Sequence, residues 1–442
     1  MTAHSTDPDT TVATLPNGVG VVTLRLPHLD SASVSVFVRT GSAHESKRLN
    51  GASHFCEHMA FKGTLARSCQ QVNLDAELLG AEVNAHTDKD HTAYHMRGMA
   101  RHAGQFVHML ADIVRHSTFP QAELERERQV ILHEYTEDED DGMSTAFKLF
   151  DTLCFGAHAL AQPVIGTRGN IQRLTRDELV AYVRQQYTGA NIIVGVAGNV
   201  DPDEVLKDAQ AAFGSMETGT PNALAPPTYL GGVASRRLPG APQTHVVLGF
   251  PLPALAGEHH AGVVAAALFG EGMSSPLMDQ SRERRALVYY AACSADVMEL
   301  CGQFVIEAST APEHVNEFFT EVMRLLVAHA ETIAPIDLER ARNQIAVRHL
   351  RAQEQPYQRL EDAARDLFAL GRVRPRAETL ARVQAVSADE VRAEFSRMLA
   401  SPPAVALAGK VAQGVSERVR ELVRGLVAPH RLASTRSTIT PD

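Results

Sequence analysis

The chain has 442 residues, 44% of them hydrophobic and 21% charged, and its formal net charge at pH 7 is −10. This length is enough for two to four domains, each with its own core. The negative charge and the absence of a cluster of Lys and Arg argue against a nucleic-acid-binding surface.

The beginning of the chain carries no recognisable targeting signal. Residues 1–8 lack the basic and apolar regions of a signal peptide and the arginines of a transit peptide. The sequence also contains no apolar run of about eighteen residues, so we expect no membrane-spanning helix. The five cysteines form no Cys-x-x-Cys pair, which is typical of reduced thiols. We expect a cytoplasmic location in a bacterium.

The first clear elements are a strand and a short histidine-rich helix. Small or polar residues alternate with apolar residues over positions 31–38, as in a half-buried strand. In the following motif, His54-Phe55-Cys56-Glu57-His58, a helix of about 100° per residue would place both imidazoles and the Glu57 carboxylate on one side. Two imidazoles suit Zn²⁺, and the order His-x-x-Glu-His is the inverzincin pattern, in which the glutamate is the general base of a peptidase.

The surroundings of this motif extend the interpretation. The run from Gly51 to Thr64 resembles the zinc helix of the M16 peptidases. The resemblance implies one zinc ion per chain, held by His54, His58 and a third ligand on a later helix. Glu134 is at the matching distance downstream. Glu127, two helical turns before it, is assigned to the catalytic set as a carboxylate that holds the ligands in place. Without the motif, both glutamates would be read as a solvated helix face.

Residues 79–87 resemble the strand of this family whose edge pairs with the substrate backbone, which assigns Asn84 and Ala85 to substrate binding. The next segment contains His91 and His95. In a strand, residues four apart lie roughly 13 Å from one another, so this pair alone does not predict a second metal site.

An internal repeat divides the chain. Leu124-Glu125-Arg126 recurs at Leu338-Glu339-Arg340, 214 residues later, and residues 175–179 and 194–200 recur at 387–391 and 405–411. The metal-binding residues have no counterparts, because Glu134 corresponds to Arg348 and residues 261–269 contain neither histidine nor carboxylate. The scaffold is therefore duplicated, whereas the predicted zinc site occurs once.

The repeat, the strand-like runs and the long helical stretches predict an α+β fold with two homologous domains. Each domain is expected to be a mostly antiparallel sheet covered by helices, and the family resemblance implies that the two enclose a clamshell chamber. Residues 219–232 are rich in Gly and Pro and are predicted to be a linker. The predicted segments are 1–218 for the zinc-bearing domain, 219–232 for the linker, 233–433 for the second domain and 434–442 for a disordered tail.

The second half carries one candidate functional segment, residues 272–289. It resembles the family region in which an Arg and a Tyr seven residues apart reach the substrate, and Arg282 and Tyr289 occupy those positions. Pro276 and Ala286 depart from the usual Arg and Gly of that region. Arg282 as a surface arginine and Tyr289 as a core aromatic residue are the alternatives.

The sequence thus predicts a zinc metalloendopeptidase that hydrolyses unfolded peptides or short polypeptides inside a closed chamber. The family resemblance implies a homodimer, or a heterodimer with a related M16 subunit. Two alternatives stay open: a non-catalytic assembly or peptide-binding subunit, and a metal-storage protein. Nucleic acid and membranes are not expected as partners.

Overall fold

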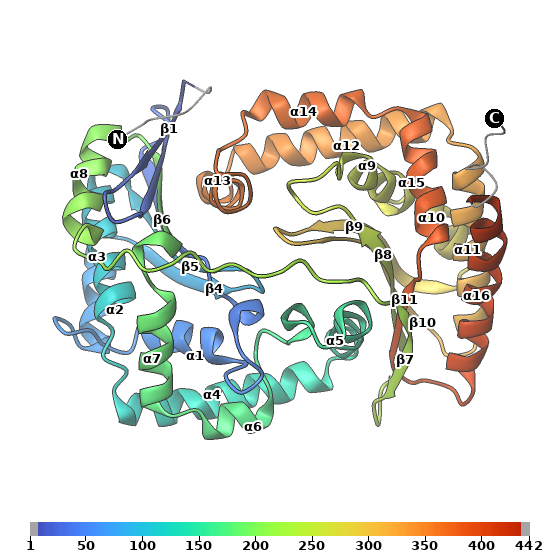
Figure 1. The fold of residues 1–442 in the computed structure, drawn as a ribbon, viewed down its shortest axis with the longest axis horizontal. Coiled ribbons are helices and arrows are strands. Elements are labelled where there is room, and N and C mark those ends of the chain that lie inside the picture. The colour runs from blue at the N-terminus through green and yellow to red at the C-terminus, as the bar shows by residue number, and fades with distance from the viewer. Residues whose placement is uncertain (1–7, 435–442) are drawn as a thin grey trace, which may run out of the picture. The chain divides into compact units, whose positions relative to one another are not determined.

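The computed structural model describes residues 8–434, which divide into two compact units (Figure 1). Unit 1 contains the chain up to Tyr135 together with Gln162–Leu224 and Leu350–Arg376. Unit 2 contains Thr136–Ala161, Ala225–His349 and the chain from Ala377 onward.

Unit 1 is built on a six-stranded sheet in the order β1-β2-β6-β3-β5-β4. Neighbouring strands are antiparallel except for the parallel pair β2 and β6. Strand β4 lies at one edge of this sheet. The strands are β1 Thr10–Thr14, β2 Gly20–Arg25, β3 Ser31–Val38, β4 Glu82–Thr87, β5 Thr92–Met99 and β6 Ile192–Gly198.

Helices cover both faces of this sheet. One face packs Val34, Val36 and Val194 into a core with α3 and α8. The other face packs Val22, Phe37 and Ile193 against Leu360 and Ala363 of α13. The helices of unit 1 are α1 Ala52–Ala60, α2 Cys69–Leu78, α3 Ala103–His116, most of α4 Gln121–Asp140, α6 Arg168–Arg173, α7 Arg176–Gln186, α8 Pro202–Phe213 and α13 Pro356–Leu370, with 3-10 turns η1 Ser42–His44, η2 Ala100–His102 and η4 Gly189–Asn191.

Unit 2 is built on a five-stranded sheet in the order β7-β11-β8-β10-β9. Only β7 and β11 are parallel. The strands are β7 Gly232–Arg237, β8 Thr244–Leu252, β9 Val288–Val297, β10 Gly302–Thr310 and β11 Ala404–Gly409. The helices are α5 Gly142–Phe155, α9 His260–Gly270, α10 Pro276–Met278, α11 Val315–Glu331, most of α12 Pro335–Gln353, α14 Arg376–Ala385, α15 Ala388–Ala400 and α16 Val415–Ser434, with 3-10 turn η3 Ala159–Ala161 and π-helical turn η5 Asp279–Arg284.

The two sheets confirm the predicted fold class and the duplication. Strands β2, β6, β3, β5 and β4 correspond in order and direction to β7, β11, β8, β10 and β9, and β1 is the additional strand of unit 1. Helices α4 and α5 begin at Gln121 and Gly142, and their counterparts α12 and α13 begin 214 residues later, at Pro335 and Pro356. The offset found in the sequence is therefore the offset of the structural repeat.

The two compact units do not coincide with two continuous halves of the chain, because each contains segments from both halves. Helix α5 comes from the first half but packs on β7, β8 and β11 of unit 2, and its counterpart α13 packs on β2, β3 and β6 of unit 1. Each sheet is thus covered by one helix from the other half. Residues 217–231 form neither helix nor strand, and β7 begins at Gly232. Ser434 is the last residue of α16, and the rest of the predicted tail lies outside the described residues.

No helix within residues 8–434 combines the length and apolar character needed to cross a lipid bilayer.

Candidate active site

Helix α1 begins at a buried turn that fixes its direction. Gly51 precedes the helix with φ of +99°, a left-handed conformation that favours glycine, and a Cβ there would lie 2.9 Å from the Ile165 carbonyl oxygen. The buried Glu45 carboxylate accepts hydrogen bonds from the backbone N–H groups of Gly51 (2.7 Å) and Ser53 (2.6 Å). Glu45 therefore supplies acceptors for N–H groups at the helix start that have no partner within the helix.

The two sides of α1 differ in chemistry. Phe55, Cys56 and Met59 are buried in the core of unit 1. The opposite side carries His54, Glu57 and His58, which are only partly buried. The amphipathic pattern of this one helix thus gathers the residues of the predicted zinc motif on one side.

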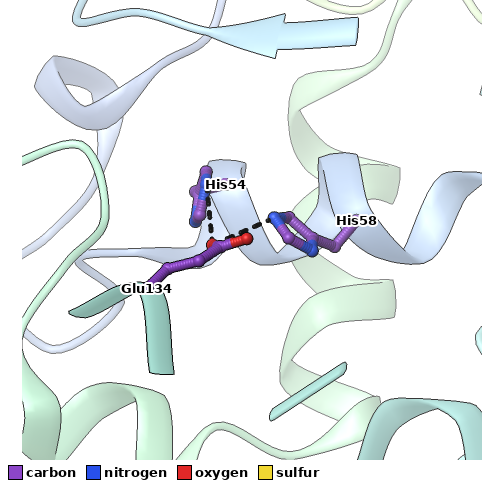
Figure 2. Close-up of side chains that lie close together, drawn as sticks. All are labelled: His54, His58 and Glu134. Carbon is purple, nitrogen blue, oxygen red and sulfur yellow. Dashed lines mark ion pairs between the residues drawn. The ribbon is translucent and has the colours of Figure 1, made fainter. Parts of the chain in front are cut away.

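The third predicted ligand reaches the two histidines from α4. The Oε2 atom of Glu134 lies 3.5 Å from Nε2 of His58 and 3.9 Å from Nε2 of His54. In Figure 2 the Glu134 carboxylate points between the two imidazole rings. Burial, followed by the proximity of His58, lowers the pKa of His54 to about 3, so its ring is neutral at pH 7.

These three residues form a donor set that fits a zinc ion. Ligand atoms of a tetrahedral site with bonds of about 2.0–2.1 Å are roughly 3.3 Å apart, which is close to the separations present here. Each of the three residues offers one ligand atom, and these atoms all lie within 4.8 Å of one another. Two neutral nitrogens and one carboxylate oxygen leave a position for water, as in catalytic zinc sites.

Glu127 of α4 contacts one of the two histidines, His58. Its Oε2 atom lies 3.1 Å from Nδ1 of His58, and its Oε1 atom forms a 2.7 Å ion pair with Lys62. A histidine that donates Nδ1–H to a carboxylate presents its Nε2 lone pair to a metal ion, and Nε2 of His58 is the atom nearest Glu134. Glu127 therefore orients the imidazole of His58.

Glu57 is tied to the edge strand of the sheet. Its carboxylate accepts a 2.7 Å hydrogen bond from the Thr87 hydroxyl at the end of β4. Burial raises the pKa of Glu57, while the Thr87 hydrogen bond and the nearby His58 act in the opposite direction. A carboxylate with a raised pKa on the same helix side as the two predicted zinc ligands is suited to accept and return a proton.

The predicted substrate-binding residues of unit 1 lie on β4. Asn84 and Ala85 pair with His95 and Tyr94 of β5, and on its other side β4 has no neighbouring strand among the described residues. The amide oxygen of Asn84 accepts a hydrogen bond from the Ala85 backbone N–H at 2.9 Å. An edge of this kind offers backbone groups to an added strand.

The predicted substrate-binding residues of unit 2 are solvent-exposed. The Arg282 side chain is 44% exposed and lies 3.9 Å from Glu283, and Tyr289 is 66% exposed at the start of β9. The core-aromatic alternative for Tyr289 is therefore wrong. Pro276 occupies the first turn of α10. Ala286 adopts φ of +51°, a left-handed conformation that favours glycine.

Several supporting residues were not found from the sequence. Thr87 lies within the segment that was read as a strand, and Lys62 lies within the zinc-helix run, but neither was assigned a role. Glu45 is also missed, and the only local signal for it is an acidic residue shortly before a glycine that precedes a helix. All three act through contacts between elements, which a linear pattern does not specify.

Comparisons with known proteins identify the family of this chain. Residues 20–168 match the family described as Insulinase (Peptidase family M16), and residues 173–345 match the Peptidase M16 inactive domain. An uncharacterized zinc protease of Mycobacterium tuberculosis is 32% identical over 407 residues, which cover 90% of this chain and 92% of that protein. The chain belongs to peptidase family M16, and its relatives support a peptidase-type function that depends on zinc.

Solved structures share the fold. A protease from Helicobacter pylori superimposes with a TM-score of 0.82 at 20% identity, over 91% of this chain and all of that one. A chain of Complex III2 from Candida albicans also gives a TM-score of 0.82, at 18% identity, over 93% of this chain and 99% of that one. The same architecture therefore occurs in a protease and in a chain of Complex III2, so the function must be argued from the site.

Proposed function

We propose that this chain is a zinc-dependent endopeptidase that hydrolyses unfolded peptides or short polypeptides. The observation that carries the proposal is the convergence of His54, His58 and Glu134, with Glu57 on the same helix as the two histidines. A zinc ion bound there would polarise the scissile carbonyl and lower the pKa of an attacking water.

The residues of the chain divide the remaining work. The Glu57 carboxylate accepts the proton of the attacking water and delivers it to the nitrogen of the leaving amine. A positioned acid–base group of this kind contributes roughly 10² to 10⁴ in rate. Glu127 holds the His58 ring through Nδ1, and Lys62 in turn holds Glu127.

The proposed substrate is an extended backbone segment added to β4. The free edge at Asn84 and Ala85 supports this mode, because main-chain pairing gives affinity without strong sequence preference. Pairing replaces the hydrogen bond between Asn84 and the Ala85 N–H. Since a folded protein cannot present such a segment, the expected substrates are unfolded.

The proposed quaternary arrangement is a dimer, either of this chain or with a related M16 subunit, that encloses a chamber. Arg282 and Tyr289 would contact the substrate from unit 2, and their exposed side chains support this role. Mass measurement of the native complex distinguishes the homodimer from the heterodimer.

The decisive experiment combines metal analysis with hydrolysis of an unstructured, internally quenched peptide. We expect zinc-dependent cleavage that is lost after chelation and restored by zinc. A zinc-loaded chain that cleaves neither this peptide nor a mixture of unfolded polypeptides would instead support a non-catalytic assembly subunit, which the shared fold alone does not exclude.

A further inference from the structure

A second cluster of metal-binding side chains lies on the opposite face of the sheet in unit 1. Side chains alternate along a strand, so His86 points away from the side on which Thr87 reaches Glu57 of α1. On that opposite face, His86 of β4 meets His95 of β5 and Glu361 of α13. The three residues offer ligand atoms that lie within 4.8 Å of one another.

The two imidazoles are stacked, with ring centroids 5.1 Å apart, and present nitrogens to each other. Nδ1 of His86 lies 3.1 Å from Nε2 of His95, close to the roughly 3.3 Å that separates two ligands on one tetrahedral zinc ion. Nδ1 of His95 lies 2.7 Å from the Ser35 hydroxyl. When this nitrogen donates its proton to Ser35, Nε2 of His95 is left with a free lone pair, as in histidines that bind metals.

The position of His95 also favours ligation. Only 5% of this residue is exposed, and its Nδ1 atom is held by the Ser35 hydroxyl. An imidazole that is held rigidly in the sheet needs little rearrangement to bind an ion.

Glu361 supplies an anionic ligand with unused capacity. Its Oε1 atom lies 2.6 Å from Nε2 of His91 and 3.4 Å from Nε2 of His86. Its Oε2 atom is buried and has no hydrogen-bond partner among the described residues. A buried carboxylate oxygen without a donor is unfavourable, and a bound cation would satisfy it.

The hydrogen bonds of this cluster leave one buried oxygen without a partner. Nδ1 of His91 lies 2.8 Å from Asp90, and its Nε2 atom lies 2.6 Å from Oε1 of Glu361. The facing nitrogens of His86 and His95 lie within hydrogen-bond distance of each other. The Oε2 atom of Glu361 has no such partner among the described residues.

We propose that His86, His95 and Glu361 form a second metal site, which binds a divalent transition-metal ion such as Zn²⁺ through two imidazole nitrogens and one carboxylate oxygen. His91 is the hydrogen-bond partner that positions the Glu361 carboxylate. The ion joins the edge strand β4 and strand β5 to α13, a helix from the second half of the chain. Its role is to fasten this helix to the sheet, so the site goes beyond the proposed peptidase activity.

The first test counts zinc bound by the full-length chain after equilibrium dialysis against excess Zn²⁺ and removal of loosely held metal. We expect about two ions per chain in the wild type and about one in His95→Ala, with peptide hydrolysis within about twofold of the wild type. His108→Ala, which removes a half-exposed histidine on α3, is the matched control and should retain about two. Two ions in His95→Ala, or one ion per saturated chain in both the wild type and His95→Ala, would overturn the proposal.

A second test isolates the new site and does not depend on catalysis. In the His54→Ala/His58→Ala double variant, Zn²⁺ should still raise the melting temperature, because about one ion still binds. Adding His95→Ala should abolish the shift, and adding Glu361→Gln should weaken binding at least about tenfold. If the double variant binds no zinc, the second site does not exist. If the zinc-dependent shift persists after His95→Ala, the ion lies elsewhere.

Discussion

The hydroxyl of Thr87 donates a 2.7 Å hydrogen bond to the carboxylate of Glu57. Thr87 ends the strand that we propose for substrate pairing, and Glu57 is the proposed general base. The contact therefore connects the element that holds the peptide to the group that moves the proton.

The first prediction concerns Glu57 itself. Glu57→Gln should keep zinc at the wild-type level while hydrolysis falls by at least about two orders of magnitude, since the ligands remain and only proton transfer is lost. Metal analysis and peptide hydrolysis should be measured on the same preparation. Substantial activity in the zinc-loaded variant would show that another group is the base.

The second prediction ranks the two glutamates of α4. Glu134→Gln should remove most of the zinc, because it replaces a proposed ligand. Glu127→Gln should weaken binding only about 10- to 100-fold, as expected for a group that orients His58. Zinc retained during dialysis against graded chelator concentrations measures both. The opposite order would mean that their roles are exchanged.

The third prediction concerns Glu45, whose carboxylate accepts backbone N–H groups at the start of α1. Glu45→Ala should lower the free energy of unfolding by about 1–3 kcal/mol, because buried donors lose their acceptor. Chemical denaturation of the metal-free protein separates this effect from zinc binding. Glu77→Ala, on the exposed side of α2, is a suitable control and should change stability little. Equal stability of the Glu45→Ala variant and the wild type would contradict the proposed capping role.

The fourth prediction compares two repeat-related helix starts. Glu178 and Glu390 both accept N–H groups in capping boxes, but Glu178 also pairs with Arg48 and Arg173. Backbone hydrogen bonding at Thr175 and these arginines lower the pKa of Glu178 to about 2. Glu178→Gln should therefore lower the free energy of unfolding at pH 7 more than Glu390→Gln does. The difference should be only roughly 0.5 kcal/mol, because the ion pairs of Glu178 are solvated.

The pH dependence follows from the sign of that shift. A carboxylate whose pKa falls on folding contributes stability above its unfolded value of 4.5 and loses it as the pH falls toward 2. The difference between Glu178→Gln and the wild type should shrink across this range in thermal melts of metal-free protein. A difference that stays constant with pH would attribute the effect to packing.

The fifth prediction concerns Arg282 and Tyr289. Because both side chains are exposed, Arg282→Ala and Tyr289→Phe should leave the zinc content and melting temperature unchanged. Both should lower kcat/KM if they contact the substrate main chain, and Tyr289→Phe should also lower kcat if its hydroxyl stabilises the oxyanion. If both variants had wild-type kinetics, neither Arg282 nor Tyr289 would contribute to substrate binding.

The sequence predicted what depends on local spacing. The pattern of His54, Glu57 and His58 defines one side of a helix whether or not its neighbours are known, and residues 175–179 recur visibly at 387–391. Glu134 needed the family resemblance, because a ligand on another helix has no spacing rule of its own. The cluster of His86, His95 and Glu361 could not be predicted, since it depends on the register of two strands and on a helix more than two hundred residues away.

The packing of α13 on the first sheet has a consequence for synthesis of the protein on the ribosome. The last strand of that sheet ends at Gly198 and α13 ends at Leu370, so 370 − 198 = 172 further residues must be translated before this face is covered. At about 5–20 residues per second, the delay is roughly 10 to 30 seconds. During this interval the apolar side chains of Val22, Phe37 and Ile193 have no covering helix.

The second sheet has no such delay, because its covering helix α5 ends at Phe155, before the first strand β7 begins at Gly232. Each half of the chain supplies one helix to the sheet of the other half. During synthesis, however, α5 is made before its sheet and α13 is made after its sheet. A chaperone that binds exposed apolar strands would therefore find its target on the first sheet before α13 is synthesised.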